Sequence, residues 1–167
     1  FSKQYDAILA TPVRAMEIAF GELLWAMARG ALYSAAFLVI MVATGLTSAG
    51  WAVGAFVAAL LVGFAFGSVG MALSTFMTSW QDFDLFVTVQ VALFLFSSTF
   101  TPLHNIGSPV LRGLVQVSPL YQSVALVRSL TLADLNLGML VNVGYLAVMS
   151  AIGLAVASRR MNKILLK

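Results

Sequence analysis

Two acidic side chains close together in the sequence are the first candidates for chemistry in this chain. Asp82 and Asp84 stand in a polar interruption between two apolar runs, and paired carboxylates can serve as general acid and general base. At this spacing, however, they point to opposite faces of an extended segment and lie about 200° apart on a helix. We therefore interpret them, with Gln81, either as a solvated loop or as a cap that stabilises the start of the following helix.

The histidine content excludes a second group of reactions. His104 is the single histidine, so no metal site with two histidine ligands is available. A Ser–His–acid triad would need an acid near His104, and Asp134 is the only candidate. We interpret His104 as an interfacial polar group rather than a catalytic base.

The sequence also lacks the residues that thiol chemistry and nucleotide binding require. The chain contains no cysteine, which excludes thiol catalysis, cysteine-ligated zinc and disulfides. The glycines of residues 63–70 lie inside an apolar run, and no GK[ST] motif follows them, so they form no phosphate-binding loop. We therefore expect no enzyme, no metal site and no cofactor bound by this chain itself.

The composition is that of a membrane protein. The chain is 61% hydrophobic and 9% charged, whereas soluble domains carry about 25% charged residues. Its mean hydropathy is +1.00 and its net charge is +3. The basic residues gather at the ends of apolar runs, as membrane topology requires, which disfavours a nucleic-acid-binding role. The chain opens on Phe1 with no signal-peptide pattern, and we expect that residues precede it.

The apolar runs predict an all-α membrane protein, since about 20 apolar residues span a bilayer. The expected architecture is one partial transmembrane domain over residues 1–167 with a polar segment at 1–22, spans at 24–47, 51–74, 85–101 and 135–158, and a proline-broken region at 102–134. Gln90 lies within the third span and is expected to hydrogen-bond to another helix rather than to a ligand.

The distribution of basic residues predicts the orientation. Four spans place both chain ends on one side. That side carries Lys3, Arg14, Arg29, Arg159, Arg160, Lys163 and Lys167, and the other carries Arg112 and Arg128. Because cytoplasmic flanks are rich in Lys and Arg, both termini and the loop of residues 81–84 are expected in the cytoplasm, and the region 102–134 is expected outside.

The first segment is expected to be broken into two helices at Thr11 and Pro12. Residues 5–10 can form a short helix that ends before Pro12, because the residue preceding a proline is pushed away from the helical region. Thr11 is then placed as the N-cap of a new helix, with Pro12 in its first turn. This second helix is expected to lie along the interface and then to enter the membrane.

The second span carries small residues at helical spacing. Ala55, Ala59, Gly63 and Gly67 recur every four residues, and small residues at this spacing let two helix backbones approach closely in lipid. The alternative is that glycine and alanine are simply common in membrane helices.

The region 102–134 is too broken to span. Pro102, Pro109 and Pro119 interrupt it, and the runs between the prolines, 110–117 and 120–132, are too short to cross a bilayer at 1.5 Å per residue. We expect two short helices that enter the bilayer and return, or that lie in the interface.

Several of these segments, in this order, resemble a known family. Residues 6–14 (DAILATPVR) with Glu17 and the pair Gly21-Glu22, residues 77–84 (MTSWQDFD), residues 99–103 (TFTPL), Pro109, and residues 118–121 (SPLY) with Arg128 are similar to segments of ABC-2 type permeases, in particular the subfamily of drug and lipo-oligosaccharide exporters. That family has six spans per permease, so the four spans here resemble its third to sixth.

The resemblance implies partners and a power source. Two permeases of that family pair around a translocation path, and cytosolic ATPase subunits, which bind ATP and Mg²⁺, dock on a coupling helix before the third span. The implied substrates are amphipathic (drugs, lipids or lipid-linked sugars), and the implied location is the plasma (inner) membrane, in contact with its lipids.

The resemblance also assigns roles to residues. The ATPase-coupling residues would be Tyr5, Asp6, Ile8, Leu9, Thr11, Pro12, Arg14 and Glu17. The outer gate of the re-entrant region would comprise Phe100, Pro102, Pro109, Pro119, Tyr121 and Arg128. On periodicity alone, residues 5–11 could equally be an ordinary interfacial helix, and phenylalanines near the gate are more often lipid-facing.

Two other classes of function remain as alternatives. One is a passive channel or ion-coupled carrier that uses residues 102–134 as a filter; carriers usually place ionisable groups near the midplane of the bilayer, and these spans hold none deeper than Arg29. The other is an intramembrane enzyme or an assembly scaffold. The lone histidine disfavours the enzyme.

Overall fold

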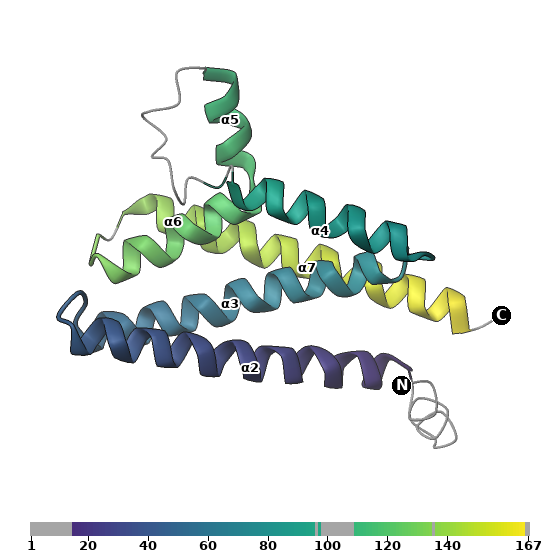
Figure 1. The fold of residues 1–167 in the computed structure, drawn as a ribbon, viewed down its shortest axis with the longest axis horizontal. Coiled ribbons are helices and arrows are strands. Elements are labelled where there is room, and N and C mark those ends of the chain that lie inside the picture. Colours follow the sequence, from purple (N-terminus) through teal and green to yellow (C-terminus); the bar gives the residue numbers. More distant parts are fainter. Residues whose placement is uncertain (1–14, 96, 98–108, 135, 166–167) are drawn as a thin grey trace.

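The described part of the chain is all-helical, as predicted (Figure 1). The computed structural model describes residues 15–95, 97, 109–134 and 136–165. The helices are α2 (Ala15–Ala43), α3 (Ala49–Ser74), α4 (Trp80–Leu95), α5 (Pro109–Val117), α6 (Pro119–Thr131) and α7 (Leu137–Leu165).

Three of these helices are long and apolar enough to cross a membrane. The candidate spans are Phe20–Ala43, Ala49–Ser74 and Leu137–Arg160, with mean hydropathies of 1.7, 2.2 and 2.0. They overlap the predicted spans 24–47, 51–74 and 135–158, with bounds that differ by up to four residues. Large apolar side chains stand exposed along them, such as Leu32 and Phe37 on α2, which is the surface that lipid would cover. The predicted span 85–101 falls on α4, whose described part is 16 residues long. Residues 96 and 98–101 of that predicted span lie outside the described residues.

The end of α2 differs from the prediction. The span was expected to continue to residue 47, but α2 ends at Ala43, because Gly45 adopts the left-handed conformation with φ +74°. The N–H of Gly45 donates to the Val42 carbonyl at 3.1 Å, and the N–H of Leu46 donates to the Met41 carbonyl at 2.9 Å. These two bonds form a Schellman motif, which ends a helix at a glycine that tolerates positive φ.

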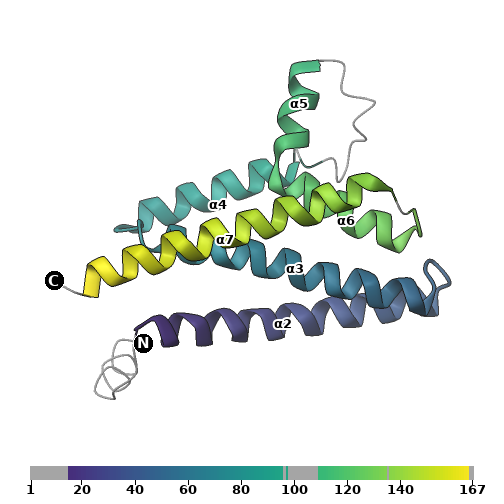
Figure 2. The same cartoon turned by 180° about the vertical axis from the view of Figure 1, so that it is seen from behind.

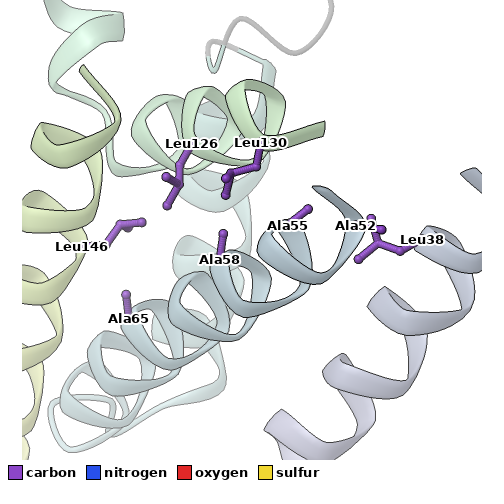
Figure 3. Packing of buried hydrophobic residues seen from close by; sticks show 8 residues of the cluster. All are labelled: Leu38, Ala52, Ala55, Ala58, Ala65, Leu126, Leu130 and Leu146. Atoms are coloured by element: carbon purple, nitrogen blue, oxygen red, sulfur yellow. The ribbon is translucent and has the colours of Figure 1, made fainter. Parts of the chain in front are cut away.

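The core is built around α3, which contacts α2, α6 and α7. Figure 3 shows small side chains of α3 facing leucines of the surrounding helices. The cluster comprises Leu38 of α2, Ala52, Ala55, Ala58 and Ala65 of α3, Leu126 and Leu130 of α6, and Leu146 of α7. The pairing of small with large side chains brings the helix axes close while filling the space between them.

The most extensive contact is that of α3 with α7. Gly153 of α7 lies against the backbone of Ser68, and a Cβ at this glycine would stand 2.8 Å from the Ser68 carbonyl carbon. Ala65, Ser68 and Ala157 are completely buried along this contact. The Ser68 hydroxyl donates to the Phe64 carbonyl at 2.6 Å, so it is satisfied within its own helix and does not hold the two helices apart.

The predicted small-residue face of α3 is divided between two neighbours. Ala55 is buried in the central cluster, and Gly67 lies directly against Leu23 of α2. Ala59 and Gly63 instead line a hollow between α2 and α3, and nothing lies within 4 Å of the Cβ position of Gly63. Only part of this face therefore makes the close contact that its spacing predicts.

The helices define two ends of the bundle (Figures 1 and 2). The start of α2, the turn between α3 and α4, and the end of α7 lie together at what we call the terminal end. The turn between α2 and α3 and the turn between α6 and α7 lie at the other end, which we call the far end. The two views agree, and this arrangement follows from the alternating direction of consecutive long helices.

The contact at Gly153 gives a first test. Gly153→Ala would place a methyl group against the Ser68 backbone, which cannot move without separating α3 from α7. We expect it to destabilise the protein by about 1–3 kcal/mol, the usual range for overpacking, measured as a lower unfolding temperature in detergent. Gly144→Ala adds the same methyl group to the same helix where nothing lies within 4 Å, and is expected to be neutral or slightly stabilising. Equal unfolding temperatures for the two variants would contradict the packing described here.

Candidate functional site

Much of the predicted coupling segment lies outside the described residues. This holds for Tyr5, Asp6, Ile8, Leu9, Thr11, Pro12 and Arg14, and, in the predicted gate, for Phe100 and Pro102. Glu17 is described and lies exposed in the first turn of α2. This places one predicted coupling residue at the terminal end, where the chain enters its first described helix.

The predicted loop of residues 81–84 is helical. Gln81, Asp82 and Asp84 lie in the first turns of α4, which begins at Trp80 rather than near residue 85. The helix starts early because Ser79 and Asp82 cap it reciprocally. The Asp82 carboxylate accepts the Ser79 N–H at 3.0 Å, and the Ser79 hydroxyl accepts the Asp82 N–H at 3.3 Å. This capping-box arrangement satisfies N–H groups that have no partner within the helix, so of the two interpretations the cap is correct for Asp82.

Asp82 also fastens the turn that precedes its helix. Its carboxylate accepts the Thr78 N–H at 2.9 Å and, more weakly, the Thr78 hydroxyl at 3.3 Å. The hydrogen bonds from the Thr78 and Ser79 N–H groups hold the pKa of Asp82 below its ordinary value of 3.8, because they favour the ionised form. The charge therefore helps to fix the path of residues 75–79 at the terminal end.

Arg160 ties the end of α7 to the same turn. Its guanidinium donates from Nη2 to the Thr75 carbonyl at 3.3 Å and lies 3.7 Å from the centroid of the Phe76 ring. A cation at the C-terminus of α3 meets the negative end of that helix's dipole, and its place over the ring adds a cation–π interaction. Sequence reasoning treated Arg160 only as a topological charge, because nothing in the pattern shows which carbonyl it reaches.

Side chains hold the joint between α5 and α6, which lies about midway along the bundle (Figure 1). Pro119 begins α6 after the N-cap Ser118 and has no N–H to continue α5. The Tyr145 hydroxyl of α7 donates to the Val117 carbonyl at 2.8 Å, and the Gln122 amide donates to the Gln116 carbonyl at 2.6 Å. These bonds satisfy the last two carbonyls of α5, which have no partner within the helix.

The two short helices lie close to where the prolines place them. They were predicted at 110–117 and 120–132, and are found at Pro109–Val117 and Pro119–Thr131. In Figure 1, α6 lies along the bundle whereas α5 stands away from it. Of the predicted gate residues, Pro109 and Pro119 begin the two helices.

Tyr121 and Arg128 line a hollow between α6 and the turn that precedes α7. This hollow has a volume of about 260 Å³ and is also lined by Asp134. A second hollow, of about 360 Å³, adjoins it and shares Tyr121. The sequence did not predict either hollow, because residues of separate helices and of the turn before α7 form their walls.

The described residues contain no group of three or more His, Cys, Asp or Glu that could hold a metal ion. The long helices are predominantly apolar between their ends, although Arg29 lies at the middle of α2.

Comparisons with known proteins identify the family of this arrangement. The family described as "ABC-2 type transporter" matches residues 3–132. Nodulation protein J of Rhizobium leguminosarum bv. trifolii is 26% identical over 166 residues, which cover 99% of this chain and 63% of that protein. The chain thus spans less than two thirds of the length of this relative. No solved structure matches it.

The cap at Asp82 gives a test at the terminal end. Asp82→Asn removes the charge that the Thr78 and Ser79 N–H groups point toward, so we expect several-fold lower hydrogen-exchange protection of these two amides, measured by mass spectrometry. Because folding lowers the pKa of Asp82, its stabilisation is complete above the ordinary carboxyl value of 3.8 and is lost as the pH falls through the lower folded value.

The pH dependence and a neighbouring residue provide the controls. The difference in protection factors between wild type and Asp82→Asn should be constant near neutral pH and should vanish well below pH 3.8. Asp84→Asn removes an equal charge from an exposed position two residues away and is expected to leave the turn unchanged. Equal effects of the two substitutions would show that the cap does not hold the turn.

Proposed function

The chain belongs to the ABC-2 type transporter family, and from this we propose that it is the permease subunit of an exporter driven by a separate ATPase. The observation that carries the proposal is the family match over residues 3–132 in a chain whose long helices have the length and apolarity of membrane spans. Membrane transport follows from the family. The power source, the direction and the substrate are the proposed part.

The proposed power source is a partner ATPase that binds ATP and Mg²⁺. The chain has no GK[ST] motif, so it would receive mechanical work rather than perform hydrolysis. The proposed contact is the coupling segment of residues 1–22. Glu17 in this segment lies in the first turn of α2, which supports a direct path from the contact into the membrane.

α2 has the properties that a lever would need. It is one continuous helix of 29 residues, about 43 Å long at 1.5 Å per residue. It contacts α3 at two separated points, through Leu23 at Gly67 and through Leu38 in the central cluster. A displacement of its first turn would therefore reach the bundle as a rigid-body movement, the kind of change that packed helices transmit.

The proposed orientation places the terminal end in the cytoplasm of a cell with this protein in its plasma (inner) membrane. Six of the nine basic residues of the chain precede α2 or follow residue 158 in the sequence, and such residues are retained on the cytoplasmic side. The α5–α6 pair, with Pro119, Tyr121 and Arg128, would then face outward as part of a gate. The translocation path would be completed by a second permease chain, identical or different.

The proposed substrates are amphipathic molecules such as drugs, lipids or lipid-linked sugars. A path beside lipid-exposed helices with polar groups at both ends suits a molecule that has an apolar and a polar part. Reconstitution with a partner ATPase in proteoliposomes tests the proposal. Uptake of a fluorescent amphiphile into inside-out vesicles should require ATP and stop with a hydrolysis-deficient ATPase. Transport that continues without ATP under an ion gradient would instead support an ion-coupled carrier.

Substitutions in the coupling segment test the contact. Asp6→Lys reverses a charge and Ile8→Asp places a charge on the apolar side of the short predicted helix, so each should weaken docking of the ATPase. We expect ATP-dependent transport to fall at least tenfold, roughly the effect of losing 1.4 kcal/mol of binding, with unchanged expression and unfolding temperature. Gln4→Lys, just before this helix, is the control and should transport normally. Normal transport by both Asp6→Lys and Ile8→Asp would refute the coupling assignment.

A further inference from the structure

Arg29 is a charged side chain within a candidate membrane span. It lies exposed on α2, inside the span Phe20–Ala43, and an uncharged run begins directly after it. Within the described part of the chain, its guanidinium has no hydrogen bond and no ion pair. Glu22, the nearest carboxylate along α2, is about 10 Å away along the helix axis. A cation at this place in a membrane helix needs an anionic partner.

Two aromatic side chains flank Arg29, one turn away on either side. Trp25 and Tyr33 are both exposed, and residues four apart on a helix are neighbours on its surface. Trp and Tyr are typical of the membrane–water interface, where their rings lie at the level of the headgroups. The three residues therefore form a surface that suits the headgroup region of a bilayer.

The depth of Arg29 agrees with this surface. Arg29 is about 21 Å from Ala43 along the axis of α2, whereas the hydrocarbon core of a bilayer is about 30 Å thick. With the end of α2 at one boundary of the core, the backbone of Arg29 lies inside the opposite boundary. Its long side chain can extend from there to the level of the lipid phosphates.

A hollow in the bundle adjoins this cation. The hollow lies between α2 and α3, has a volume of about 330 Å³ and is lined almost wholly by apolar side chains. Ala26 and Gly30 belong to its α2 wall, and Ala59 and Gly63 to its α3 wall. Ala26 is three residues before Arg29 and Gly30 directly follows it, so the cation stands beside one wall. An apolar hollow of this kind stays dry and accepts an apolar occupant.

The cation and the hollow together select a ligand with two chemically different parts. A phosphate diester is an anion that a guanidinium binds through paired N–H groups. An acyl chain in the hollow would gain contacts with walls that otherwise face empty space. A soluble anion would satisfy Arg29 but leave the hollow empty. Figures 1 and 2 show α2 at the edge of the bundle, where the ligand can arrive from the surrounding bilayer.

We propose that Arg29 and the α2–α3 hollow form a binding site for an anionic phospholipid of the surrounding bilayer. Its phosphate pairs with Arg29, and one of its acyl chains lies between α2 and α3. The site goes beyond the proposed transport, because this lipid stays with the protein, binds without ATP and is not the exported molecule. Its chain fills the gap between the two points at which α2 contacts α3, Leu23 at Gly67 and Leu38 in the central cluster.

Photo-crosslinking tests the proposal on the permease in phosphatidylcholine nanodiscs, without ATPase or ATP. The probe is a sub-saturating amount of phosphatidylglycerol with a diazirine on one acyl chain, and mass spectrometry identifies the residues to which it attaches. We expect the cross-links to concentrate on residues 26–34 of α2 and 59–67 of α3, which contain the walls of the hollow. Val148 and Ile152 are exposed on α7 and report general contact with lipid. Equal cross-linking at the hollow and at these two residues would overturn the proposal.

The charge of Arg29 is tested by a matched pair of variants. Arg29→Gln should lower the ratio of hollow cross-links to α7 cross-links about tenfold, the effect of losing one hydrogen bond to a charged group. Arg159→Gln removes an equal charge from an exposed position of α7 that is not part of the hollow, and should leave the ratio unchanged. An unchanged ratio in Arg29→Gln would overturn the proposal, as would a phosphatidylcholine probe that labels the hollow as strongly as phosphatidylglycerol does.

The hollow is tested by a second pair. Gly63→Leu fills it from α3, where nothing lies within 4 Å of the Cβ position, and should abolish the hollow cross-links. Gly50→Leu makes the same substitution at an exposed position of the same helix outside the hollow, and should preserve them. If Gly63→Leu fails to fold, the exposed Arg29→Gln variant still decides the test. Because no ATPase is present, a failure of the proposed transport leaves these outcomes unaffected.

Discussion

The close approach of α3 to α7 at Gly153 is the constraint on which the rest of the structure depends. Two helices can come this near only where one of them lacks a side chain, and a Cβ at Gly153 would stand within 3.0 Å of three backbone atoms of Ser68 and Val69. The contact sets the position of α7 along α3. With α7 in that position, Arg160 reaches the Thr75 carbonyl at the C-terminus of α3, and Tyr145 reaches the Val117 carbonyl at the α5–α6 joint.

This arrangement joins the two ends of the bundle through one packed pair of helices. α7 contacts both the turn that Asp82 and Arg160 hold and the polar hollow beside α6. If α2 displaced α3, α7 would move with α3, because the two helices are tightly packed and packed interiors deform little. Such a rigid connection is compatible with the proposed permease, in which energy would enter at one side of the membrane and the substrate would leave at the other.

The sequence predicted the elements better than their contacts. The all-α class, three of the spans and the two short helices between the prolines follow from hydropathy and from the missing N–H of Pro109 and Pro119. The sequence left the start of α4 undecided, because a Ser-x-x-Asp pattern is compatible with a helix cap and with a loop. The α3–α7 contact could not be predicted, because Gly and Ala occur on every face of α3 and only tertiary packing selects Ala65 and Ser68. The hollows beside α6 were equally hidden, because residues of several elements form their walls and the sequence does not show how these elements pack.

The proposed coupling requires that the two ends of the bundle face opposite sides of the membrane, with the terminal end in the cytoplasm. The chain has no cysteine, so single cysteines can report this directly. Gln81→Cys at the terminal end and Leu132→Cys in the turn after α6 are both exposed. Treatment of intact cells with a membrane-impermeant maleimide should label Leu132→Cys at once, and Gln81→Cys only after the membrane is permeabilised. Labelling of Gln81→Cys in intact cells, or of both positions alike, would contradict the orientation and with it the proposed site of ATPase coupling.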